Sequence, residues 1–161
     1  MIARIRRATV SDESAARAIV AEYNDAVGVV VRDDDATLRA YLRGPGALWL
    51  AEHGGAAVGC VVMRPLPNVA PGACEAKRLY VRPAQRGSGI AAALMDALET
   101  FAVRAGYRAV YLDTFEDLAG AVRFYERRGY ERIDRYNDNP QATIFMRRAL
   151  GAEGETPARR S

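Results

Sequence analysis

Apolar residues recur along the chain with two different spacings, and each spacing predicts one kind of secondary structure. Spacings of three or four residues are typical of helices with one buried face, whereas alternating or short continuous apolar runs are typical of strands. In the first half of the chain, strands are expected at Ile2–Arg7, Leu48–Ala51 and Ala57–Met63. Two helices are expected, ending at Gly28 and Gly44. The buried face of the first should carry Ala15, Ile19, Tyr23 and Val27.

The second half of the chain alternates strands with helices. Strands are expected at Cys74–Val81, Ala109–Thr114, Tyr130–Ile133 and Thr143–Ala149. One helix should run from Ile90 to Gly106, and another should end at Gly129 with Leu118, Ala121, Val122 and Tyr125 on its apolar face. A strand, a helix and a strand in succession form a right-handed crossover, so the strands at 74–81 and 109–114 should be parallel. The sum is one mixed α/β domain over residues 1–150, with about seven strands and about four helices.

Composition agrees with a single soluble domain. The 161 residues are 50% hydrophobic and 27% charged, which is ordinary for a globular protein. No apolar run is long enough to cross a membrane, and the charged N-terminus lacks the apolar core of a signal peptide. We therefore expect a cytoplasmic protein with no membrane partner. Residues 151–161 carry no apolar anchor and are expected to form a disordered tail.

Charge and ligand-type residues argue against several classes of function. The net charge is +3, and the arginines are spread along the chain, so a nucleic-acid surface is not expected. Cys60 and Cys74 lack the spacing of a metal site, and we expect free thiols. His53 is the only histidine, which argues against a histidine-based triad or an HExxH zinc site. No metal is expected.

One segment predicts an anion-binding site. After the strand ending at Val81, the chain enters a basic turn with Gly87 and Gly89, and the turn opens directly into the helix at Ile90. Glycines allow a tight turn without a Cβ, and the first amide groups of a helix have no partner within it. Arg86 adds a positive charge beside these amides. The expected ligand is a phosphate or a pyrophosphate.

Two common phosphate-binding folds fit this segment poorly. The Gly-Lys-Ser/Thr ending of nucleotide hydrolases is absent. Residues 87–92 match the Gly-x-Gly-x-x-Ala fingerprint of dinucleotide-binding folds, and Asp113 ends the next strand. However, residues 82–86 separate the strand from the first glycine, and the strand itself carries charged residues at Glu75, Lys77 and Arg78. A dinucleotide-binding fold is therefore the weaker interpretation.

Two motifs in succession resemble a known family. Residues 86–91, Arg-Gly-Ser-Gly-Ile-Ala, are similar to the Arg/Gln-x-x-Gly-x-Gly/Ala pyrophosphate motif of the GNAT family of N-acetyltransferases. Residues 121–130, Ala-Val-Arg-Phe-Tyr-Glu-Arg-Arg-Gly-Tyr, are similar to that family's Ala-x-x-Phe/Leu-Tyr-x-x-x-Gly-Phe helix. The strand at 74–81, with Asn139 and Pro140 further on, resembles a bacterial subgroup. The resemblance implies a mixed, mostly antiparallel sheet with a splayed parallel pair.

The resemblance also implies a reaction. Acetyl-CoA would be the donor and a primary amine the acceptor, with small molecules ranked first and direct transfer in a ternary complex. The amides of residues 86–91 would hold the CoA pyrophosphate, and the strand at 79–81 would pair with the pantetheine arm. The implied CoA-binding residues are Leu79, Tyr80, Val81, Arg86, Gly87, Ser88, Gly89, Ile90, Ala91 and Tyr125. A non-catalytic acyl-CoA sensor or interaction module is the alternative function. The resemblance is also compatible with a homodimer, because dimers are frequent in the family.

Tyr125 matches the family tyrosine that protonates the departing thiolate. An ordinary tyrosine has a pKa of about 10 and a thiol one of about 8.5, so this proton transfer is uphill by about 2 kcal/mol. Either the site lowers the tyrosine pKa, or the hydroxyl mainly donates a hydrogen bond to developing charge. The apolar row with Leu118 and Val122 also fits simple packing. Leu118 replaces an asparagine common in the family, so that polar contact is not carried over.

Glu75 is the candidate general base, because some family members carry a base glutamate at this place in the strand. The acceptor amine is mostly protonated at neutral pH, and an ordinary glutamate, with a pKa near 4.3, needs a water relay or burial to act on it. The alternative is a solvated carboxylate paired with Lys77 or Arg78. Asp33–Asp35 form either an acidic lip for a cationic amine or the solvated start of a helix. Trp49 and Tyr136 either shape the acceptor pocket or simply pack.

Overall fold

The chain folds into two compact units. The computed structural model describes residues 3–115 and 119–151. The N-terminal unit combines residues 3–64 with 76–100, and the C-terminal unit combines residues 65–75 with 101–151. Each unit is described by itself below. The sequence pattern does not predict this division, and the single domain over residues 1–150 stays a prediction. The tail expected at residues 151–161 lies almost entirely outside the described residues.

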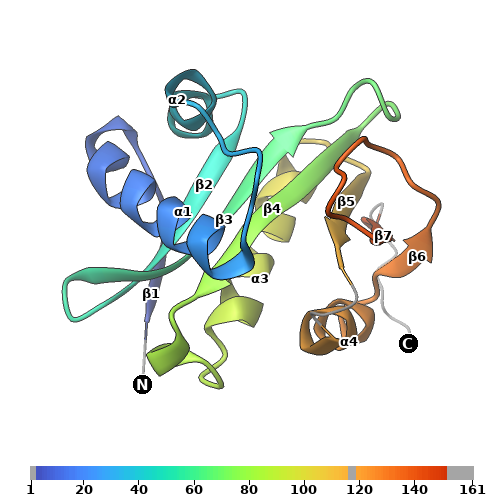
Figure 1. Ribbon diagram of the computed structural model, residues 1–161. Helices are drawn as coiled ribbons and strands as arrows, with labels where there is room; N and C mark the ends of the chain where they lie inside the picture. The colour runs from blue at the N-terminus through green and yellow to red at the C-terminus, as the bar shows by residue number, and fades with distance from the viewer. Residues whose placement is uncertain (1–2, 116–118, 152–161) are drawn as a thin grey trace. The chain divides into compact units, whose positions relative to one another are not determined.

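The strands belong to one seven-stranded sheet with the hydrogen-bonded order β1-β2-β3-β4-β5-β7-β6 (Figure 1). Their bounds are β1 Arg4–Arg7, β2 Ala47–His53, β3 Ala56–Pro65, β4 Ala73–Val81, β5 Ala109–Thr114, β6 Glu131–Ile133 and β7 Ile144–Ala149. The pairs β1–β2, β2–β3, β5–β7 and β6–β7 are antiparallel. Strand β4 pairs in parallel with β5 through Ala73, Cys74 and Glu75. The mostly antiparallel sheet with a parallel pair is therefore confirmed.

Four α-helices lie among the described residues, as predicted. They are α1 Glu13–Val27, α2 Asp35–Arg43, α3 Ile90–Arg104 and α4 Ala119–Arg127, and two 3-10 helices occupy Val10–Asp12 and Pro83–Gln85. Gly28 ends α1 in the left-handed conformation, which is the common glycine cap. Leu118, expected on the apolar face of the last helix, lies outside the described residues. No described helix combines the length and the apolar character needed to span a bilayer.

Helices cover both faces of the strands in the N-terminal unit (Figure 1). One core cluster joins α1 and α2 to β2 and β3, and it includes Ala16, Ile19, Val20, Leu38, Tyr41, Leu42, Leu48, Leu50, Cys60 and Val62. On the opposite face, a Cβ built on Gly59 would lie 3.4 Å from Leu94 of α3. Of the four residues predicted for the buried face of α1, Ile19 is buried, Tyr23 and Val27 are partly buried and Ala15 is exposed, whereas Ala16, Val20 and Asn24 are buried.

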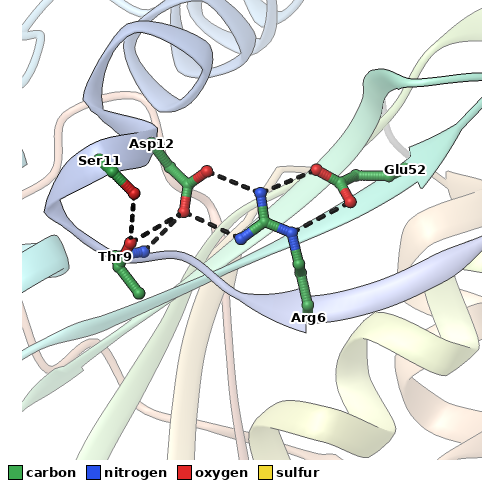
Figure 2. Close-up of polar contacts among 5 residues, drawn as sticks. All are labelled: Arg6, Thr9, Ser11, Asp12 and Glu52. Carbon is green, nitrogen blue, oxygen red and sulfur yellow. Dashed lines mark hydrogen bonds and ion pairs between the residues drawn. The ribbon is translucent and has the colours of Figure 1, made fainter.

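Arg6 joins three elements of the N-terminal unit through its guanidinium (Figure 2). It donates to both carboxylate oxygens of Asp12 at 2.9 and 2.6 Å, and to both of Glu52 at 3.0 and 2.9 Å. The backbone amide of Thr9 also donates to Asp12, at 2.8 Å. These hydrogen bonds, with that from Arg6 the largest cause, hold the pKa of Asp12 at about 2. β1 is thereby tied to the turn before α1 and to the end of β2.

Asp12→Asn should destabilise the chain at neutral pH and lose that effect in acid. Because folding depresses the pKa of Asp12 from 3.8 to about 2, its stabilisation is complete above pH 3.8 and fades as the pH falls towards 2. The shift corresponds to about 2 kcal/mol of unfolding free energy. Urea unfolding of both proteins between neutral pH and about pH 3 measures the difference.

The matched control is Asp35→Asn, which removes the exposed ion pair with Arg17. The two side chains of that pair are 65% and 45% exposed, so solvent screens the interaction and the substitution should change stability little. A destabilisation of Asp12→Asn that stays constant across the pH range would contradict the ion-pair explanation.

Candidate active site

The predicted glycine turn lies directly before α3 in the N-terminal unit. Residues 86–89 are exposed, and Gly87 and Gly89 have φ angles of 80° and 86°. These angles lie in the left-handed region that side chains disfavour, and a Cβ built on either glycine would have no atom within 4 Å. Ile90 is buried and begins α3, so the first helical amides follow the turn at once. The turn presents accessible backbone at a helix start, which is the local geometry that anion binding needs.

Arg86 anchors this turn to β4. Its Nε donates to the carbonyl oxygen of Val81 at 2.9 Å, and its Cζ lies 5.9 Å from the centroid of the Tyr80 ring. The hydroxyl of Ser88 donates to the carbonyl of Gln85 within the turn. Arg86 therefore uses one donor to fix the backbone and keeps its positive charge beside the turn.

The end of β4 is held by β3 and by α1. The amide of Arg82 donates to the carbonyl of Val58 at 2.8 Å, and a Cβ on Gly59 would lie only 2.7 Å from the carbonyl oxygen of Tyr80. Arg82 also binds the carboxylate of Glu22 through two donors, at 2.9 and 2.6 Å. Burial and the charge of Glu22 raise the pKa of Tyr80, whose hydroxyl donates to that carboxylate at 3.4 Å. The strand segment expected to face the pantetheine arm is thus firmly positioned.

Arg78 has a φ angle of 58° inside β4, which is unusual for a residue with a side chain. Its guanidinium donates twice to Asp33, each time at 3.2 Å, and the two side chains are 11% and 8% exposed. The hydroxyl of Tyr41 also donates to Asp33, at 3.2 Å, and burial followed by the charge of Asp33 raises the pKa of Tyr41. Asp33 forms an internal ion pair, so neither predicted interpretation, acidic lip or solvated helix start, describes it.

The other two aspartates of that group do begin a helix. Asp34 is the N-cap of α2 and accepts a hydrogen bond from the amide of Thr37 at 2.8 Å. Asp35 binds Arg17 of α1. For these two residues the helix-start interpretation is confirmed.

Glu75 lies in the C-terminal unit and is 2% exposed. The hydroxyl of Tyr136 donates to its Oε2 at 2.6 Å, and Nδ2 of Asn137 lies 3.5 Å from the same oxygen. Both partners come from the loop between β6 and β7. The predicted alternative of a solvated carboxylate is wrong, because the side chain is buried and Arg78 binds Asp33 instead.

A second carboxylate, Asp113 of β5, joins this group. It accepts a hydrogen bond from Nδ2 of Asn137 at 2.7 Å, and Nδ2 of Asn139 lies 3.4 Å from both of its oxygens. The Oδ1 of Asn137 accepts the amide of Asn139 at 2.9 Å, and the Oδ1 of Asn139 accepts that of Gln141 at 3.1 Å. These backbone contacts fix the orientation of both amides, so each Nδ2 faces the carboxylates.

Sequence reasoning missed most of this group. It weighed Asp113 only for a dinucleotide-binding fold and did not single out Asn137. The one available signal was the density of amide and carboxylate side chains in residues 134–141, a composition typical of loops built on side-chain turns.

Tyr125 lies in α4 of the C-terminal unit and is 9% exposed. Its ring contacts Phe124 and Tyr130 edge to face, with centroids 5.3 and 5.7 Å away. This aromatic cluster supports the packing interpretation of the ring. The role of the hydroxyl stays a prediction. Trp49, at 5% exposed, is likewise packed in the core.

The remaining candidate groups do not form a reactive centre. Cys60 and Cys74 are free, as predicted, and buried. Burial raises the pKa of each thiol to about 12, so neither is a ready nucleophile. Within residues 3–115 and 119–151, no three or more histidine, cysteine and carboxylate side chains are grouped so that they could hold a metal ion.

Comparison with known proteins identifies relatives by sequence. The model of the acetyltransferase (GNAT) family matches residues 13–130. The uncharacterized N-acetyltransferase YjgM of Escherichia coli K12 is 33% identical over 138 residues, covering 81% of this chain and 83% of that protein. The uncharacterized N-acetyltransferase C1271.07c of Schizosaccharomyces pombe is 39% identical over 97 residues, 60% of this chain and 58% of that protein. The chain thus spans less than two thirds of the length of this second relative.

Solved structures share the fold. An acetyltransferase of the GNAT family from Staphylococcus aureus Mu50 has a TM-score of 0.79 at 20% identity, covering 93% of this chain and 100% of that one. The PaiA N-acetyltransferase of Thermoplasma acidophilum, solved in complex with coenzyme A, has a TM-score of 0.70 at 15% identity, covering 92% and 99%. At these identities the likeness concerns the fold alone. On the strength of the family match over most of its length, the chain belongs to the acetyltransferase (GNAT) family.

Proposed function

We propose that the chain is an acetyl-CoA-dependent N-acetyltransferase that moves an acetyl group to a primary amine of a small molecule. The observation that carries this proposal is the exposed glycine turn at the start of α3, held against β4 by Arg86. It offers backbone amides and a positive charge to a pyrophosphate, and coenzyme A contains one. The cytoplasmic location and a homodimer stay predictions.

The residues of the turn fit coenzyme A. The amides of residues 86–91 would hold the pyrophosphate, because both glycines leave the surrounding space open. The end of β4, Leu79–Val81, would pair its backbone with the amides of the pantetheine arm. The register of β4 with β5 covers only Ala73, Cys74 and Glu75 of a nine-residue strand, which supports a role for the rest of β4 outside that ladder. The acetyl thioester would supply the activated carbonyl.

The proposed chemistry needs one base and one acid. The amine nitrogen attacks the thioester carbonyl, so a carbon–nitrogen bond forms and the carbon–sulfur bond breaks. Glu75 accepts the proton that the acceptor ammonium must lose, directly or through water. Tyr125 donates a hydrogen bond or a proton to the departing sulfur. Burial of Glu75 away from bulk water is the observation that supports its part.

The experiment that tests the proposal is release of free thiol from acetyl-CoA over a broad panel of amines. Release that depends on the amine, with the N-acetyl product identified by mass spectrometry, supports the enzyme. Binding of acetyl-CoA without release on any amine supports a non-catalytic acyl-CoA-binding module instead. A panel that includes amino acids, polyamines, aminoglycosides and lysine peptides also separates small-molecule from protein acceptors.

Gly89→Ala should weaken acetyl-CoA binding about tenfold or more without unfolding the protein. The φ angle of 86° costs a residue with a Cβ roughly 1–2 kcal/mol, and relief of that strain turns the amides away from the anion. Calorimetric titration with acetyl-CoA measures the change. Gly106→Ala is the matched control at the other end of α3, where φ is 90° and the space is equally open. Equal affinities of the two variants would refute the turn as the pyrophosphate site.

Tyr125→Phe should lower kcat about a hundredfold while the Kd for acetyl-CoA stays nearly unchanged, because only the hydroxyl acts on the departing sulfur. Steady-state rates and calorimetric titration give the two quantities. Tyr130→Phe, in the same aromatic cluster, is the control and should keep wild-type kcat. A Tyr125→Phe enzyme with unaltered kcat on its acceptor rules the role out.

Glu75→Gln should remove the acidic limb of the pH–rate profile. Glutamine keeps the shape of the side chain and cannot take the proton of the ammonium, so kcat/KM should be low and nearly flat in acid. The profile is measured with the best acceptor of the panel. A variant with the wild-type limb would remove Glu75 from the mechanism.

A further inference from the structure

The carboxylate of Glu75 is bound by a loop that the mechanism above does not use. We infer that Tyr136 and Asn137, in the loop between β6 and β7, are positioning residues that hold the carboxylate of Glu75 in the orientation needed for proton transfer. This inference rests on the proposed function, and it adds to it the residues that make Glu75 a usable base. All the residues involved belong to the C-terminal unit.

Tyr136 holds Glu75 through a short hydrogen bond on a fixed ring. Its hydroxyl lies 2.6 Å from Oε2 of Glu75, and its ring is packed edge to face on Tyr111 at 5.2 Å and on Phe145 at 5.5 Å. Two ring contacts at steep angles leave the phenol little freedom, so its hydroxyl is directed at one carboxylate oxygen. Fixing Oε2 fixes the plane of the carboxylate as well, and thereby the direction of Oε1.

Asn137 connects the two carboxylates of the group. Its Nδ2 lies 2.7 Å from Oδ2 of Asp113 and 3.5 Å from Oε2 of Glu75. Two carboxylates this near to one another repel when both are ionised, and a shared amide donor reduces the penalty. A side-chain amide does not ionise near neutral pH, so Asn137 orients the carboxylates without titrating itself.

Arg135 holds the backbone of the loop that carries these two residues. The guanidinium donates to the carbonyls of Asn137 at 3.3 Å, Asn139 at 3.0 Å and Ala142 at 2.9 Å, and its Cζ lies 4.7 Å from the centroid of Phe145. Because one guanidinium binds three backbone carbonyls, the loop is already ordered in the absence of substrate. The hydrogen bonds to Glu75 therefore cost little additional ordering.

Other charged and titratable groups surround Glu75 and must be counted in its pH dependence. They are Cys74 and Lys77 on β4, Tyr111 and Asp113 on β5, Arg147 on β7, and Tyr136 in the loop. Among them, Tyr136 donates its hydroxyl directly to the carboxylate. A donor on the ionised form favours that form, so loss of the hydroxyl should favour the protonated, inactive base.

The first test needs no substrate. A double-mutant cycle in urea unfolding at neutral pH compares wild type, Tyr136→Phe, Glu75→Gln and the double variant. A charge-assisted hydrogen bond should appear as a coupling of about tenfold or more in the unfolding constant. The same cycle with Tyr111→Phe in place of Tyr136→Phe is the control and should show less than about twofold coupling. No coupling between Tyr136 and Glu75 overturns the inference, whether or not the chain transfers acetyl groups.

The second test separates positioning from general support of the fold. In Tyr136→Phe the acidic limb of kcat/KM should move up by about one pH unit, so activity falls about tenfold below the limb and changes little above it. Tyr111→Phe should leave the limb in place. A Tyr136→Phe rate reduced equally at every pH, or not at all, overturns the inference. Failure of the proposed function is a different result, since wild type itself would then release no thiol.

Discussion

Burial of the Glu75 carboxylate is the constraint that organises the C-terminal unit. A carboxylate removed from water is costly unless donors replace the lost hydration. The donors here are a phenol and an amide, and the loop between β6 and β7 is shaped to supply them. Side-chain turns at Asn137 and Asn139, and the guanidinium of Arg135, set that shape. The same loop also directs the amides of Asn137 and Asn139 at Asp113, so one polar arrangement serves both carboxylates.

The N-terminal unit meets a different requirement, because its proposed ligand is an anion and its backbone must approach closely. Two glycines with positive φ give the turn before α3 its exposed amides, and Arg86 holds the turn against β4. Nearby charges are neutralised in pairs: Arg82 binds Glu22, and Arg78 binds Asp33.

Local structure was predictable from the sequence, and long-range pairing was not. Apolar spacing placed every helix and strand within a few residues, because helix and strand periods are properties of adjacent positions. The turn at Gly87 and Gly89 was predictable for the same reason, because its conformation depends on adjacent residues. The non-catalytic alternative for Glu75 offered only the nearby Lys77 or Arg78 as partners, whereas Tyr136, which donates a hydrogen bond to it, lies 61 positions along the chain. Periodicity also placed Ala15 rather than Ala16 on the buried face of α1, because a row spaced strictly by four residues drifts around a helix of 3.6 residues per turn.

The strand β4 shows why such partners escape sequence reasoning. Glu75 and Arg78 are opposite charges three positions apart, and proximity alone predicts a pair. The register with β5 ends at Glu75, the compact units divide directly after it, and Arg78 adopts a φ angle of 58°. Arg78 binds Asp33 of the N-terminal unit, and Glu75 accepts a hydrogen bond from Tyr136 of the C-terminal unit. The phenol of Tyr136 orients the Glu75 carboxylate through a hydrogen bond rather than through an opposite charge.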